Sequence, residues 1–131
     1  MPVEVRWYLD KRVMESRYWG QITLEDIKQG VGEGLELIKG YPYPIPHIIE
    51  LSASTSVETS LGNYSDLAAQ LRQLDKRNWV IIVGVTGVTK FIASVVTHMA
   101  GLNCKLTDSL DEAHTFAEHV AAPEVQAQVD N

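Results

Sequence analysis

The chain has 131 residues, of which 45% are hydrophobic and 21% are charged, which suits one globular domain that can bury a core without disulfides or metal. Its formal net charge of -6 opposes contact with a phosphate backbone and argues against nucleic acid as a partner.

The first segment, Val3 to Gly20, predicts a β-hairpin. Val3, Val5 and Trp7 alternate with polar side chains, as a half-buried strand requires. Asp10–Arg12 has the composition of a turn, and the second strand then runs to the glycine.

A helix is predicted from Ile22 to Lys39. Thr23 is a natural N-cap, and Asp26 stands where it can return a hydrogen bond. Three glycines weaken the middle of this helix, which we interpret as close packing against a neighbour rather than as a ligand site. They are Gly30, Gly32 and Gly34.

The segment from Gly40 to Pro46 contains three prolines and predicts a stiff, extended connection. Its candidate contact residues are Tyr41, Tyr43 and Ile45. Aromatic and apolar groups on such a loop serve either a contact with another molecule or the capping of their own sheet, and the sequence leaves both alternatives open.

His47 to Leu51 predicts the next strand, and Ser52 to Ser60 predicts a polar loop after it. A helix is expected to begin at Tyr64 or Ser65, with its apolar residues at helical spacing.

Trp79 to Val85 is almost wholly apolar and rich in β-branched side chains. A strand without polar alternation is buried on both faces, so we predict the centre of a parallel sheet covered by helices. A helix follows from about Val88 to Ala100, and Gly101 is a suitable stop.

Asn103–Thr107 predicts a short last strand, and Ser109 predicts the cap of a final helix with Glu112 at the capping-box position. We therefore expect one domain over residues 1–121 and a loose tail over 122–131. The element order is β-β-α-β-α-β-α-β-α. It predicts an α/β layered fold whose mixed sheet has an N-terminal antiparallel hairpin followed by helix-strand repeats.

Three stretches resemble the SpoIIAA-like, or STAS, fold of anti-sigma-factor antagonists. Tyr18–Asp26 resembles the passage from a strand through glycine and Ile-Thr into the first helix, and His47–Ser52 resembles the strand before the regulatory loop. Val80–Val85 with Leu110–Ala113 resembles the later strand and the acidic start of the last helix. The resemblance implies a small bacterial regulatory protein of an uncharacterised branch.

The chain departs from the antagonists at the phosphorylation motif. They carry an Asp-Ser-Ser-Gly sequence where the strand meets the second helix, and this pattern is absent here. Hydroxyl groups are nevertheless abundant, so the resemblance implies a set of phosphorylation or interaction candidates without singling out one. They are Ser52, Ser54, Thr55, Ser56 and Ser60.

The sequence contains no constellation of catalytic residues. The loop Gly84–Lys90 lacks the spacing of a Walker A motif, so Thr86, Gly87 and Lys90 are candidates for a simple anion site, with a capped tight turn as the alternative. The four histidines do not cluster by spacing, no Gly-x-Ser-x-Gly elbow exists, and we expect no metal, no cofactor and no enzymatic activity.

Our first hypothesis is therefore a non-catalytic regulatory or protein-interaction module, whose contact face is the Ser52–Ser60 loop with the start of the next helix. The alternative is a carrier of a small apolar ligand, because some relatives of the fold resemble CRAL-TRIO lipid-binding proteins. A small enzyme is the third hypothesis.

The single cysteine, Cys104, excludes an internal disulfide and suits a reducing cytoplasm, where we expect the protein without membrane insertion. A homodimer is also predicted, because alternation turns some of the hairpin aromatic side chains away from the core. These are Trp7, Tyr8, Tyr18 and Trp19.

Overall fold

The hairpin forms as predicted. The computed structural model describes residues 3–58, 64–74, 77–85 and 87–122. Strands β1 (Val3–Leu9) and β2 (Val13–Ile22) pair antiparallel. Their turn places Lys11 in the left-handed region at φ 63°, and the Arg12 amide donates to the Leu9 carbonyl over 2.9 Å.

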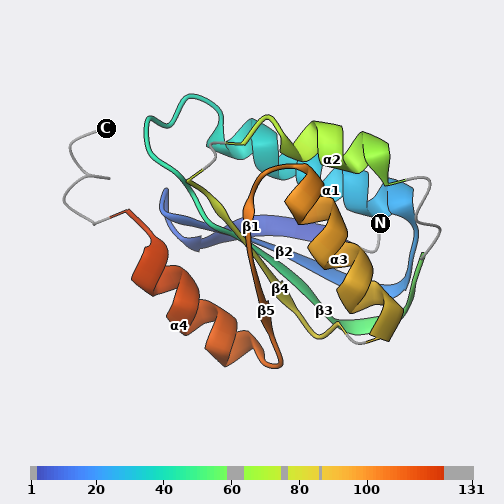
Figure 1. Ribbon diagram of the computed structural model, residues 1–131. Coiled ribbons are helices and arrows are strands. Elements are labelled where there is room, and N and C mark those ends of the chain that lie inside the picture. Colours follow the sequence, from blue (N-terminus) through green and yellow to red (C-terminus); the bar gives the residue numbers. More distant parts are fainter. Residues whose placement is uncertain (1–2, 59–63, 75–76, 86, 123–131) are drawn as a thin grey trace.

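Within these ranges the sheet has five strands in the order β1-β2-β3-β4-β5. β3 (His47–Val57), β4 (Trp79–Val83) and β5 (Asn103–Thr107) run parallel to one another and to β2. β4 has a parallel neighbour on each side, which confirms the position predicted for the apolar strand (Figure 1).

The helices cover the two sheet faces unequally (Figure 1). α1 (Leu24–Ile38), α2 (Ser65–Leu71) and α3 (Gly87–Met99) lie together on one face, while α4 (Leu110–Val120) lies on the other. Right-handed crossovers that always step toward the same sheet edge place α1–α3 on one face, whereas α4 follows the last strand and is not part of a crossover. Within the described parts of the chain, no helix combines the length and apolar composition of a bilayer span.

The predicted caps hold two of these helices. Thr23 Oγ1 accepts from the Asp26 amide over 3.2 Å, and the Asp26 carboxylate accepts from the Thr23 amide over 2.8 Å, which completes the capping box of α1. Ser109 Oγ accepts from the Glu112 amide over 3.1 Å at the start of α4. Such caps satisfy N–H groups that have no partner inside the helix.

Two of the three apolar clusters among the described residues lie between the layers, and the third contains Met14 and Tyr43. The larger lies between the sheet and α1–α3, and it includes Ile49, Val80 and Ile82. The smaller lies between the sheet and α4, where Ile48 and Ile81 contact helix residues. The members contributed by the helix are small: Ala113 and Ala117, both fully buried.

Two glycines of α1 allow this helix to lie close to the sheet, as predicted. A side chain at Gly30 would overlap the hydroxyl of Tyr18, and a β-carbon at Gly34 would stand 2.8 Å from Cε1 of His47. At Gly32 the nearest atom is the tip of the Gln70 side chain, at 3.3 Å. Gly30 and Gly34 are therefore packing residues.

The end of the domain differs from the prediction at one residue. Ala122, which we assigned to the loose tail, is buried beside Met14 and Tyr43. Its carbonyl accepts a hydrogen bond from Arg12 Nε over 3.0 Å. Residues 123–131 lie outside the described ranges.

Candidate functional site

The segment predicted as a polar loop is mostly strand, which corrects the sequence interpretation. β3 continues to Val57, and its second half stays paired with the long strand β2, so that Gly20 lies opposite Ser54 and Gln21 opposite Ser56. Irregularities in the register fall next to Gly20. The ten residues of β2 supply a partner that the hydroxyl-rich composition alone does not reveal.

The predicted hydroxyl candidates therefore occupy the carboxyl end of β3. Ser52, Thr55 and Ser56 are exposed, whereas Ser54 is half-buried and its hydroxyl donates to the Leu51 carbonyl over 2.6 Å. Ser60 lies outside the described residues.

Glu58 fixes the end of this strand to two helices. Its side chain accepts from the Leu24 amide over 3.1 Å at the start of α1. Its carbonyl accepts from the hydroxyl of Tyr64, the residue before α2, and burial raises the pKa of that hydroxyl. The hydroxyl candidates before Glu58 are thus carried by a strand whose carboxyl end is held in place.

A cleft of about 250 Å³ adjoins this end of the sheet. The cross-strand row Glu4, Arg17 and Glu50 lies along it, with Trp19 and Ser52 beside the row. The carboxyl ends of parallel strands are a common position for binding sites, since the chain leaves the sheet there.

The side chains of the cleft differ in exposure. Trp19 is 44% exposed, and Glu50 is buried with its carboxylate accepting from the Ser52 amide over 2.6 Å. Arg17 is exposed and makes no ion pair with another described residue. An exposed tryptophan beside an arginine that is available for a partner is typical of interface hot spots.

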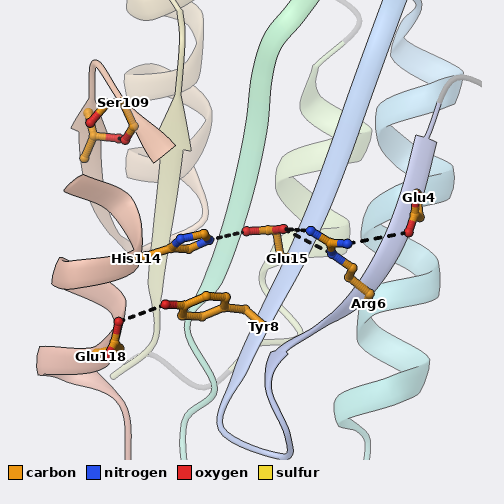
Figure 2. Close-up of polar contacts among 8 residues, drawn as sticks. Glu4, Arg6, Tyr8, Glu15, Ser109, His114 and Glu118 are labelled. Atoms are coloured by element: carbon orange, nitrogen blue, oxygen red, sulfur yellow. Dashed lines mark hydrogen bonds and ion pairs between the residues drawn. The ribbon is translucent and has the colours of Figure 1, made fainter. Parts of the chain in front are cut away.

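A second polar group lies under α4 and is centred on Glu15 (Figure 2). This carboxylate is fully buried, accepts from Arg6 Nη2 over 2.9 Å, and lies 2.6 Å from His114 Nε2. The ring of Tyr8 stacks on His114 at 3.7 Å between centroids and donates its hydroxyl to Glu118. Burial and this hydrogen bond raise the pKa of Tyr8.

These contacts tie the last helix to the hairpin. Glu15 and His114 are 99 residues apart in the chain. The turn at Asp10–Arg12 already places Arg6 opposite Glu15, so the sequence carried a signal for half of this group. The contribution of the histidine depends on how α4 packs, which spacing alone does not specify.

A third polar group lies under α1. Ser16 Oγ is 2.6 Å from His47 Nε2, and both side chains are buried together with Tyr18. Burial lowers the pKa of His47 to about 4, so its imidazole is neutral at pH 7, and it raises the pKa of Tyr18. The pair has the composition of a nucleophile and its base, but α1 covers it closely at Gly34.

The proline-rich connection caps its own domain at two of its three candidate residues. Tyr43 and Ile45 are buried, and the Tyr43 hydroxyl donates to the Lys11 carbonyl over 3.0 Å. Tyr41 is half-buried and meets Trp7 edge-to-face at 5.8 Å. The capping alternative therefore describes Tyr43 and Ile45, because their side chains point into the protein.

The remaining predicted site is the start of α3. Gly87 begins this helix at φ 56°, Lys90 is exposed, and Thr86 lies outside the described residues. The anion site stays a prediction. In the described ranges no three histidine, cysteine or acidic side chains gather as metal ligands would.

The similarity of this chain to known proteins lies in its structure rather than in its sequence. No known protein-family model matches the sequence, and no curated protein sequence does. An uncharacterised protein of the DUF3478 family from Shewanella loihica, with a SpoIIAA-like fold, superimposes with a TM-score of 0.60 at 15% identity, over 88% of this chain and 91% of the other.

The anti-sigma factor antagonist SpoIIAA in its unphosphorylated form superimposes with a TM-score of 0.57 at 8% identity, over 89% of this chain and 97% of the other. Both matches cover most of this chain and of the other. The chain has the SpoIIAA-like fold, as the residue resemblance predicted.

Proposed function

We propose that the protein is a non-catalytic regulatory module that binds another protein through the carboxyl ends of β2 and β3. The observation that carries this proposal is the exposed Trp19 beside Arg17 in the 250 Å³ cleft, next to the exposed hydroxyl groups of β3. Tryptophan and arginine are the residues that most often dominate binding energy at interfaces.

The fold supports the same function. The solved antagonist with this fold is named for its action on an anti-sigma factor, which is a protein partner. The face proposed here includes Ser52, which follows the last residue that pairs β3 with β4 and lies where β3 continues beside β2. We place the protein in the cytoplasm because its one cysteine suits a reducing compartment.

The arrangement of polar groups supports a function without catalysis. Ser16 and His47 lie under α1, and the buried Glu15 carboxylate is already engaged by Arg6 and His114. A catalytic base must come within hydrogen-bond reach of its substrate, and both groups are covered by helices.

Site-specific photo-crosslinking in the source cells tests the proposal. A photoreactive phenylalanine analogue replaces Trp19, and a matched variant carries it at Leu37, which is similarly exposed at 43% on α1. We expect one discrete protein adduct at position 19, absent at position 37 and lost when Arg17→Glu is added. Equal adducts at both positions, or none at position 19, would contradict the proposed face.

Phosphorylation is the regulation that this face suits. A phosphate on Ser52 would add negative charge to the cleft that Arg17 lines and change what the cleft attracts, and a phosphate on Thr55 or Ser56 would add charge farther along the same strand. Mass spectrometry of protein purified from its source cells tests this. Phosphate on the β3 hydroxyls supports the switch, and an unmodified segment under every growth condition argues for constitutive binding.

The carrier hypothesis has one supporting observation, an apolar void of about 60 Å³ between the sheet and α1–α3. Ile49, Leu67 and Ile92 are among the residues that line it. Pockets for drug-sized ligands measure roughly 300–1,000 Å³, so a lipid-like molecule would require these helices to move apart. A native mass spectrum showing a retained apolar molecule would support a carrier, and a bare chain mass would remove it.

A further inference from the structure

β5 is the sheet edge farthest from the hairpin, and it has no second strand partner among the described residues. The Thr107 carbonyl accepts from the Gly84 amide over 3.3 Å, so this residue points its backbone groups toward β4. Successive residues of a strand point these groups to opposite sides. Cys104 and Leu106 therefore direct their N–H and C=O groups away from the sheet.

An acidic groove of about 710 Å³ lies along this edge, between β5 and α4, and its lining on the helix runs from Asp111 to His119. Three carboxylates line it, those of Asp108, Asp111 and Glu112, all on exposed residues. Lys105 is the cation that faces them from β5, and its ammonium lies 5.4 Å from the centre of the Phe116 ring. Negative charge prevails in the groove.

The other face of the same edge is apolar. Leu106 and Cys104 are half-buried on the α3 side of the sheet, and Met99 at the end of α3 is 45% exposed. A strand added beside β5 would alternate its side chains between these two surroundings. One set would meet carboxylates, and the other would meet Leu106 and Cys104.

We propose that β5 binds an extended segment of a partner protein as an added parallel or antiparallel strand, and that this segment alternates basic and apolar side chains. Backbone hydrogen bonds to Cys104 and Leu106 would hold the strand, and the acidic groove would select its basic residues. A second copy of this chain is a poorer occupant, because a two-fold pairing of edges would bring the two acidic grooves together. The surface is separate from the cleft of the proposed function.

The test uses the full chain and three short, end-capped peptides, followed by amide chemical shifts in NMR spectra. A peptide of alternating lysine and valine should shift the amides of Asn103–Thr107, with Cys104 and Leu106 among the largest. The same peptide N-methylated at alternate residues cannot pair its backbone and should lose binding. A peptide of alternating glutamate and valine should leave these amides unchanged.

Two protein variants distinguish binding of the lysine peptide at the groove from non-specific attraction of the peptide to an acidic protein. Asp111→Lys should weaken the lysine peptide on the order of tenfold, because like charges meet across the groove. Glu36→Lys makes the same charge change on the exposed face of α1 and should have little effect. Thermal melts confirm that both variants fold, and Asp111→Asn repeats the test without adding a cation.

The proposal would be overturned if Glu36→Lys weakened the peptide as much as Asp111→Lys, or if the N-methylated peptide bound equally well. It would also be overturned if no β5 amide shifted. Sedimentation of the free chain tests whether a second copy binds β5 instead. A dimer whose β5 amides are protected from exchange would show that it does, and would overturn the proposal.

Discussion

Gly30 and Gly32 stand two residues apart on α1 and meet different surroundings. A methyl group at Gly30 would overlap the hydroxyl of Tyr18, a side chain that is 1% exposed and has no room to move. At Gly32 the same methyl group would meet the tip of Gln70 at 3.3 Å.

These surroundings predict opposite effects of the same substitution. Gly32→Ala should raise the free energy of unfolding by up to about 1 kcal/mol, because alanine favours the helix. Gly30→Ala should lower it by about 1–3 kcal/mol, because the core is overpacked. Urea denaturation measures both, and equal shifts of the two midpoints would contradict the close approach at Gly30.

His47 predicts a pH-dependent loss of stability. Burial lowers its pKa from 6.5 to about 4, so the unfolded chain binds a proton that the folded chain excludes between these values. The stabilisation is complete above pH 6.5 and falls as the pH drops toward 4, by on the order of 3 kcal/mol.

Denaturation at a series of pH values checks this prediction, with His47→Asn as the comparison. The variant keeps a polar group beside Ser16 but does not titrate in this range. Its free energy of unfolding should change less than that of the wild type between pH 6.5 and pH 4. Parallel curves would show that His47 is protonated in the folded state.

Single residues differ in how well the sequence predicts them. The caps Thr23 and Ser109 were predictable because their partners lie three residues away. The contact of Ser16 with His47 spans 31 residues and exists only through the register of β2 against β3. The spacing of residues along the sequence therefore does not predict this pair.

At the scale of elements, α4 depends on one buried carboxylate. Glu15→Ala should cost on the order of 3 kcal/mol of unfolding free energy, because it removes the charged hydrogen bonds to His114 and Arg6 and leaves unfilled the space of a fully buried side chain. Glu118→Ala removes one exposed hydrogen bond to Tyr8 and should cost less than about 1 kcal/mol. Chemical denaturation gives both values, and a reversed ranking would show that small-residue packing alone holds the helix.

The elements themselves were largely predictable, with one instructive failure. Caps, glycine stops and apolar runs predicted, in their order, the nine elements found in the described residues. The segment from Ser52 to Val57 was wrongly predicted as loop, because serine and threonine favour turns in isolation. Its partner, the long strand β2, decides its structure instead.

At the scale of the whole molecule, protection from hydrogen exchange should follow the layers. β4 lies between two parallel strands and under helices on both faces, and Val80–Val83 are buried. Its amides should exchange among the slowest in the protein, while the outward amides of Cys104 and Leu106 exchange faster. Fast exchange in β4 measured by NMR would refute its central position.

The homodimer stays a prediction, and the structure leaves one hairpin aromatic side chain as its candidate contact. Tyr18 is buried, Tyr8 stacks on His114, and Trp7 contacts Tyr41, so the chain itself covers these rings. Trp19 is the hairpin aromatic that remains 44% exposed. If a dimer forms through the hairpin, Trp19→Glu should dissociate it in sedimentation at micromolar concentration, whereas Leu37→Glu on α1 should not.

The fold class followed from the element order, because right-handed crossovers leave few ways to place three parallel steps after a hairpin. The candidate site did not follow as completely. The sequence placed Trp19 among four hairpin aromatic residues without showing which of them stays exposed, and irregular register lies on both sides of this residue in the pairing of β2 with β3. Such local departures from regular pairing are set by the assembled sheet.

The placement of α4 has a consequence for synthesis in the cell. A ribosome makes the chain from its N-terminus, so every strand emerges before this helix does. Until then, Val13, Ile48 and Ile81 have no cover from the described elements on their face of the sheet. A nascent chain stalled after β5 would therefore expose an aggregation-prone apolar surface that chaperones can bind. Completion of α4 would cover that surface.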